Sequence, residues 1–190
     1  MRRAKKYSKL DSLDLLGGMK VTPWLWTQLH DLFDTDDGSL PEVRVDYSDT
    51  TAMVTEYALL RERAVDALTQ NPHFWSNVHK EERPLDSVSN PAALVASGEA
   101  APFHVVFGGI RFCGVTIPDV GVFVFPDELV LDYRMGSPWG PKELEAFFQL
   151  LVELSAFDPQ TSLSLEDGVL AEVVARFQQA RRRYRAEHAA

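Results

Sequence analysis

The chain has 190 residues, of which 45% are hydrophobic and one is a cysteine, and this length fits one globular domain. Its single Cys113 excludes an intramolecular disulfide and a zinc site made of cysteines alone, and it favours a reducing compartment. The basic residues at the start are not followed by the apolar segment of a signal peptide, and no window approaches the length of a membrane span. The sequence therefore predicts a cytoplasmic protein that does not bind membranes.

The net charge of −9 is unevenly distributed along the chain. Residues 1–9 carry five basic side chains and no acid, and they are predicted to be a mobile basic tail. Residues 176–190 hold five arginines and one glutamate, so residues 10–175 have 27 acidic and nine basic side chains, a net charge of −18. An acidic body repels nucleic acid and attracts basic partners, although an acidic surface also serves solubility alone.

The first half of the chain predicts two helices and one strand. Thr22 and Pro23 are typical of a helix start, and an acidic turn over 34–38 follows that helix. The alternation of Val43 and Val45 with polar residues predicts a short strand. A long helix is expected over 51–70, and residues 80–102 are expected to form a long connection. The long helix has apolar residues on one face and charged residues on the other: Met53, Tyr57, Leu60, Ala64 and Leu68 against Glu56, Arg61, Glu62 and Asp66.

The second half predicts most of the sheet. Four strands are expected within 103–134, with a hairpin turn at Gly108–Gly109, and such short turns require antiparallel pairing. A strongly amphipathic helix should begin at Gly140–Pro141, and an edge strand and a last helix that ends before the arginines of 181–185 should follow. We therefore predict a single α+β domain over 10–185, with an antiparallel meander of about four to six strands flanked by three to four helices.

No pattern in the sequence predicts a catalytic site. Cys113 is expected to be buried in mid-strand and inert, and His104 should face solvent because it alternates with apolar neighbours. The histidines lack metal-ligand spacing, and there is no phosphate-binding loop or nucleophile elbow. The sequence thus predicts a protein without enzymatic activity, metal or cofactor.

Two segments are the candidate partner-binding residues. The first is an acidic helix end and turn suited to a basic partner: Asp31, Asp34, Asp36 and Asp37. The second joins the last predicted strand to the amphipathic helix and is rich in residue types enriched at interfaces: Asp132, Tyr133, Arg134, Met135 and Trp139. For Trp139 the alternative is a buried staple at the corner between strand and helix.

Several stretches resemble bacterial immunity proteins, and the most similar family is the polymorphic-toxin immunity family numbered 52. They cover roughly the last 120 residues: the segment 132–141, the helix with 147–151, Asp158–Pro159, the segment 164–169, and the earlier 71–75. The resemblance implies an antitoxin that stays in the producing cell's cytoplasm and blocks a delivered toxin. It also implies that the partner is a restriction-endonuclease-like nuclease, of a kind often exported by type VI secretion.

The hypothesis from the sequence is an immunity protein that neutralises a toxin, as a nuclease inhibitor, by protein–protein contact. An adaptor or chaperone for a secreted effector is the second alternative. A hydrolase that uses scattered carboxylates and His104 is the third.

Overall fold

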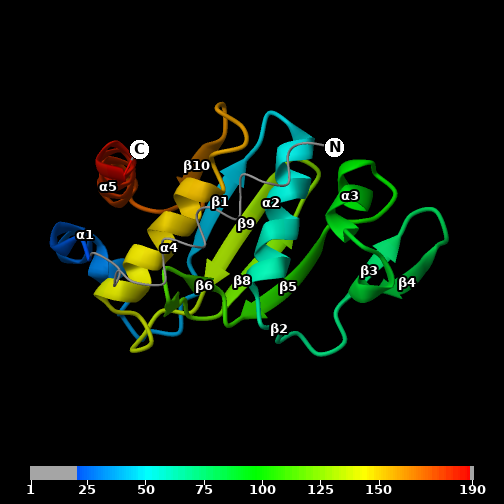
Figure 1. Cartoon of the computed structure of the whole chain (residues 1–190), viewed down its shortest axis with the longest axis horizontal. Coiled ribbons are helices and arrows are strands. Elements are labelled where there is room, and N and C mark those ends of the chain that lie inside the picture. The colour runs from blue at the N-terminus through cyan, green and yellow to red at the C-terminus, as the bar shows by residue number, and fades with distance from the viewer. Residues whose placement is uncertain (1–20, 189–190) are drawn as a thin grey trace.

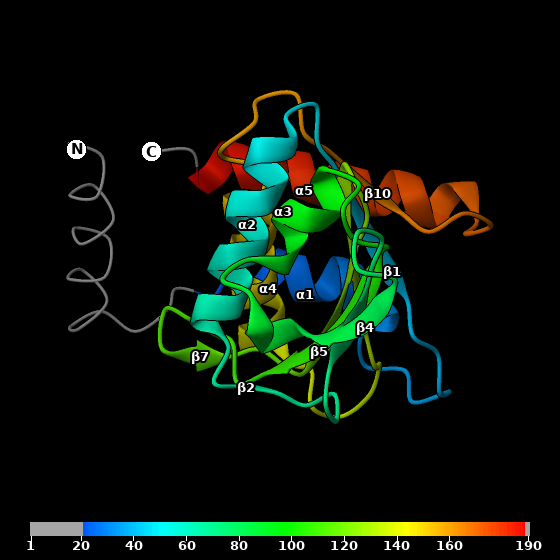
Figure 2. The same cartoon turned by 90° about the vertical axis from the view of Figure 1, so that its right-hand side faces the viewer.

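The computed structural model describes residues 21–188, and its centre is a six-stranded antiparallel sheet with helices packed on one face (Figures 1 and 2). The predicted α+β class and the number of strands are confirmed. The predicted tail at residues 1–9 lies outside the described residues. The sheet has the order β10-β1-β9-β8-β5-β2. Its strands are β1 (Glu42–Asp46), β2 (Asp66–Ala67), β5 (Phe103–Gly108), β8 (Val120–Val124), β9 (Glu128–Tyr133) and β10 (Ser162–Leu165).

Five helices occur in the described part of the chain. They are α1 (Pro23–Leu29), α2 (Thr50–Arg63), α3 (Pro91–Ala96), α4 (Pro141–Glu153) and α5 (Ala171–His188). Helices α2 and α4 cover the sheet, and α1 and α5 pack on α4 (Figure 1). The helix predicted from Pro23 is confirmed, and a 3-10 turn, η2 (His30–Leu32), extends it.

Helix α2 is shorter than predicted. Asp49 caps its start by accepting a hydrogen bond from the Thr51 N–H at 2.8 Å. The helix ends after Arg63 because Ala64 takes an extended conformation, and the chain then pairs with β5 through β2. Glu56, which was expected to face solvent, is fully buried.

The segment 80–102 is not the long connection that was predicted. Strands β3 (His73–Ser76) and β4 (Glu81–Pro84) form a hairpin, and η3 (Leu85–Ser87) and α3 follow it. Asn90 caps α3 by accepting a hydrogen bond from the Ala92 N–H, and Pro91 occupies the first helical turn. Phe74 inserts from β3 into the core.

The predicted meander is correct for three strands and wrong for the fourth. Residues 110–117 leave the sheet and form a small hairpin, β6 (Arg111–Phe112) and β7 (Val115–Thr116), which packs against α4, so β5 pairs directly with β8. Residues 110–117 fold back on themselves because the chain turns at Cys113 and Gly114, whose φ angles of 47° and 78° are those of a tight two-residue hairpin.

Helix α5 continues through the arginine-rich segment instead of ending before it. Tyr184 is fully buried in the core, which anchors the last turns of the helix. Two arginines of the helix bond to the rest of the fold, Arg176 to Asp31 and Arg181 to the Leu163 carbonyl. Arg183 bonds to Glu187 within the helix, and its guanidinium lies over the Trp24 ring of α1, 4.0 Å from the ring centroid.

Candidate functional site

One face of the six-stranded sheet has no helix over it within residues 21–188. In Figure 2 helices α2, α3 and α4 lie on one side of the sheet, and α5 passes beside the β10 edge. The strand register places one row of side chains across the opposite side: Ser164, Arg44, Val130, Phe123 and His104. We call this side the open face.

The β5–β8 part of the open face is aromatic. The His104 ring stacks on Phe123 with a centroid distance of 4.0 Å, and Phe125 follows at 6.2 Å from Phe123. Val130 is 3% exposed but lies outside the core formed with the helices, so side chains of the open face itself bury it. This half-buried apolar strip is the kind of surface that a protein partner can cover.

The β1–β10 part of the open face is acidic. Arg44 is surrounded by three carboxylates at long ion-pair distances: Glu42 at 4.0 Å, Glu128 at 3.9 Å and Asp167 at 3.8 Å. Burial raises the pKa of Glu128, and the charge of Arg44 opposes that rise. One arginine cannot balance these acids, so the face attracts cationic groups.

His104 on β5 and Asp132 on β9 form a pair on the open face that reaches across β8. The His104 Nε2 atom lies 2.7 Å from an Asp132 carboxylate oxygen. Gly121 stands opposite Asp132 on β8, and its missing side chain provides the space that the carboxylate fills. His104 does face away from the core, as predicted, but it is held by Asp132 rather than free in solvent.

Replacing Gly121 with alanine should break this pair. The added methyl group would overlap the Asp132 carboxylate, so Asp132 must move away from His104. We expect a loss of stability of roughly 1–3 kcal/mol and a changed His104 ring signal in an NMR spectrum. Unchanged His104 chemical shifts in the variant would contradict the view that the space at Gly121 lets the Asp132 carboxylate reach His104.

The predicted segment around residue 135 supplies core residues instead of a surface. Tyr133, Met135 and Trp139 are 2%, 8% and 4% exposed, so they are not available to a partner, which corrects the prediction. The Tyr133 hydroxyl donates to the Leu32 carbonyl at 3.0 Å, and the Trp139 indole N–H donates to the Arg134 carbonyl at 2.9 Å. Both rings pack on Phe33 and Phe147. The alternative of a buried staple describes Trp139 correctly.

Of that segment, Asp132 and Arg134 remain accessible, and Asp132 belongs to the open face. The four predicted aspartates of the acidic turn are exposed, but three of them have polar partners in the fold. Asp31 binds Arg176 at 2.6 Å, and Asp34 lies 3.3 Å from His30. Asp37 accepts a hydrogen bond from the Ser39 N–H at 2.9 Å, and the hydrogen bonds from Ser39 lower the pKa of Asp37. Asp36 lies close to Gly136.

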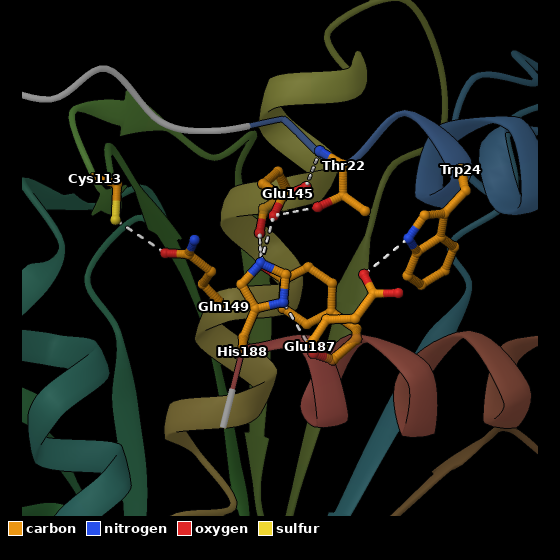
Figure 3. A network of polar contacts seen from close by, with 8 residues as sticks. Thr22, Trp24, Cys113, Glu145, Gln149, Glu187 and His188 are labelled. Atoms are coloured by element: carbon orange, nitrogen blue, oxygen red, sulfur yellow. Dashed lines mark hydrogen bonds and ion pairs between the residues drawn. The ribbon is translucent and has the colours of Figure 1, made fainter. Parts of the chain in front are cut away.

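A second polar cluster lies where α1 and α5 meet α4 (Figure 3). Glu145 is fully buried, and it accepts hydrogen bonds from the Thr22 N–H at 2.8 Å, the Thr22 hydroxyl at 3.1 Å and the Tyr184 hydroxyl at 2.7 Å. The His188 Nε2 atom lies 3.6 Å from the same carboxylate. Because Glu145 belongs to α4 and its partners come from the start of α1 and from α5, this carboxylate joins three helical segments.

Cys113 borders this cluster and does not occupy the buried mid-strand position that was predicted. It lies in the β6–β7 turn, is partly exposed, and its thiol donates to the Gln149 side-chain oxygen at 2.9 Å (Figure 3). The sequence signal that was missed is Gly114, which with Cys113 makes a second candidate turn close to Gly108–Gly109.

Residues 21–188 also lack the features of two other kinds of site. Across that part of the chain, none of the helices combines the length and apolar character that crossing a bilayer requires. Nor does that part hold any group of three or more histidine, cysteine or acidic side chains arranged to bind a metal ion.

The open face thus combines an aromatic strip, an acidic cluster and a histidine–aspartate pair, and of these residues only Asp132 was predicted from the sequence to bind a partner. No protein-family model, curated protein or solved structure matches this chain.

Proposed function

We propose that this protein is a non-enzymatic inhibitor that binds a basic protein through its open face. The single observation that carries the proposal is the combination, on one uncovered side of the sheet, of a half-buried aromatic strip and an acidic cluster around Arg44. Buried apolar contacts supply affinity at interfaces, and complementary charge supplies rapid and specific association.

The resemblance to immunity proteins supports a delivered toxin as the partner, and a nuclease fits the charge of the open face. A nuclease binds phosphate through basic residues, so an acidic face of this kind either occludes its cleft or steers association beside it. The proposal places the protein in the cytoplasm, where it would meet an incoming nuclease.

The proposal is tested with the product of the gene beside this one, purified with and without the inhibitor. Reversing two charges of the open face, with Glu42→Lys and Asp46→Lys together, should weaken binding roughly 10- to 100-fold and release nuclease activity. The measurement is the dissociation constant at several salt concentrations, together with DNA cleavage by the neighbouring protein.

The matched control reverses two exposed charges away from the open face, with Glu62→Lys on α2 and Glu99→Lys beside β5. At high salt, where the effect of the changed net charge is screened, this control should leave the dissociation constant nearly unchanged. Equal losses in both double variants would contradict a localised site. A neighbour that binds this protein but keeps its full activity would favour the adaptor instead of the inhibitor.

A further inference from the structure

A pocket lies at the β2 end of the sheet, outside the open face. It has a volume of about 830 Å³ and is bounded by α2, the connection from β2 to β3, and η3. This volume is within the range of sites that bind small molecules, roughly 300–1,000 Å³. None of the open-face residues Arg44, Phe123, Val130 and Asp132 lines it.

The interior wall of the pocket is mainly apolar. Val105 and Phe107 from β5 and Leu85 from η3 are buried there, and Tyr57 of α2 packs on Phe107 with ring centroids 6.1 Å apart. Because these side chains are already almost fully buried, the favourable term would come mainly from the water that an apolar ligand body loses when it lies against them.

Tyr57 is the polar group inside this wall. Tyr57 is 1% exposed, and it lines the pocket. Burial raises the pKa of Tyr57 to about 12, so the hydroxyl keeps its proton at neutral pH and can donate it. A neutral phenol that lines a pocket can donate a hydrogen bond to an acceptor on a ligand.

Arg61 lies one helical turn after Tyr57 and also lines the pocket. Its Nη1 atom donates to the carbonyls of Val88 and Ser89 at 3.4 and 3.2 Å, which fixes the guanidinium. Its Nε and Nη2 atoms make no hydrogen bond within the described residues, so they are free to bind an anion. Arginine and a neutral phenol together are donors suited to a carboxylate.

The rim limits the charge that the pocket accepts. Asp66, Asp86 and His73 line it and are exposed. These two carboxylates repel an anion with two negative charges more strongly than they repel an anion with one. The pocket is therefore better suited to a carboxylate than to a phosphate dianion.

We propose that this pocket binds a monocarboxylate with an apolar body, held by the Tyr57 hydroxyl and the Arg61 guanidinium, with the apolar part on Val105, Phe107 and Leu85. The carboxylate is that of a free apolar acid or that of the last residue of a peptide. This site goes beyond the proposed inhibitor function and does not depend on it.

The test uses the full chain labelled with nitrogen-15 and follows amide signals of the pocket during titration. The small probes are 3-phenylpropionate, its neutral amide and 3-phenylpropylamine, and the peptide probe is a tripeptide ending in phenylalanine with a free or an amidated C-terminus. We expect saturable shifts confined to the pocket for at least one carboxylate probe, and binding at least tenfold weaker for its uncharged or cationic counterpart. Binding by the propionate indicates a free acid, and binding by the free peptide alone indicates a peptide end.

A variant without the phenol group separates the site from general apolar binding. Tyr57→Phe keeps the ring and should weaken carboxylate binding roughly 10- to 100-fold. Tyr47→Phe, the control, removes a buried hydroxyl outside the pocket and should leave carboxylate binding unchanged. The proposal is overturned if no carboxylate probe shifts the pocket signals, if the amides bind as well as the acids, or if Tyr57→Phe binds as the wild type does.

Discussion

Replacing Glu56 with glutamine should make the protein more stable at pH 8 and remove most of its loss of stability between pH 5 and pH 8. Glu56 is fully buried in α2, and neither carboxyl oxygen has a hydrogen-bond partner among the described residues. Burial, reinforced by the charge of Glu153 and opposed by Arg63, raises the pKa of Glu56 to about 8.

The sign of the effect follows from which state holds the proton. Below the ordinary pKa near 4.5, Glu56 is protonated in both states and contributes no pH dependence. Between about 4.5 and 8 the folded protein keeps the proton and the unfolded chain loses it, so the free energy of unfolding falls as pH rises. One such group contributes at most about 1.4 kcal/mol per pH unit, and roughly 4–5 kcal/mol over the whole interval.

Urea unfolding at pH 5, 6, 7 and 8 measures this dependence for the wild type and for Glu56→Gln. Glu62→Gln, an exposed change on the same helix, is the control and should follow the wild-type curve. Parallel curves for wild type and Glu56→Gln would show that Glu56 ionises normally in the folded protein.

The burial of Glu56 could have been predicted from position but not from residue type. Met53, Glu56, Tyr57 and Leu60 have the spacing of a helix face, and all four are buried. The charge of Glu56 predicted a position in solvent, and that prediction is wrong. The neighbours that tolerate it, among them Tyr47, come from other elements, and helical periodicity carries no information about them.

The location of the turns shows a different limit. Gly108–Gly109 and Cys113–Gly114 are both suited to hairpin turns, and local preference does not decide which one closes a ladder of the main sheet. Packing of β6 and β7 against α4 decides it, and Cys113 in the turn between them bonds to Gln149 of α4, which lies 36 positions further along the chain. Once residues 110–117 leave the sheet, β5 pairs with β8, and His104 comes to lie beside Asp132.

The open face follows from this register, which is why alternation within single strands did not reveal it. Alternation correctly predicted that His104 points away from the core. It could not show that Phe123 and Asp132 lie beside His104, because this requires the order of three strands. Similarly, the residue types of Tyr133 and Trp139 fit an interface and a core equally well, and the contact with Phe33 from a distant helical segment is what buries them.

Replacing Glu145 with alanine should lower the free energy of unfolding by roughly 3–5 kcal/mol, because several buried donors lose their acceptor at once. The hydroxyl of the fully buried Tyr184 would lose the carboxylate that accepts its hydrogen bond. The Thr22 N–H and hydroxyl at the start of α1 would lose the same acceptor. The measurement is chemical unfolding of variant and wild type in the same buffer, followed by far-UV circular dichroism.

Glu187→Ala is the matched control, since Glu187 also joins α1 and α5 but does so at the surface, by accepting from the Trp24 indole N–H at 3.0 Å and from Arg183 at 2.8 Å. Water replaces these exposed contacts, so the loss should be much smaller than for Glu145. Because Tyr184 also anchors α5, the double variant Glu145→Ala with Tyr184→Phe should lose less than the sum of its single changes. Equal losses for Glu145→Ala and Glu187→Ala would mean that the buried carboxylate does not hold α1 and α5 against α4.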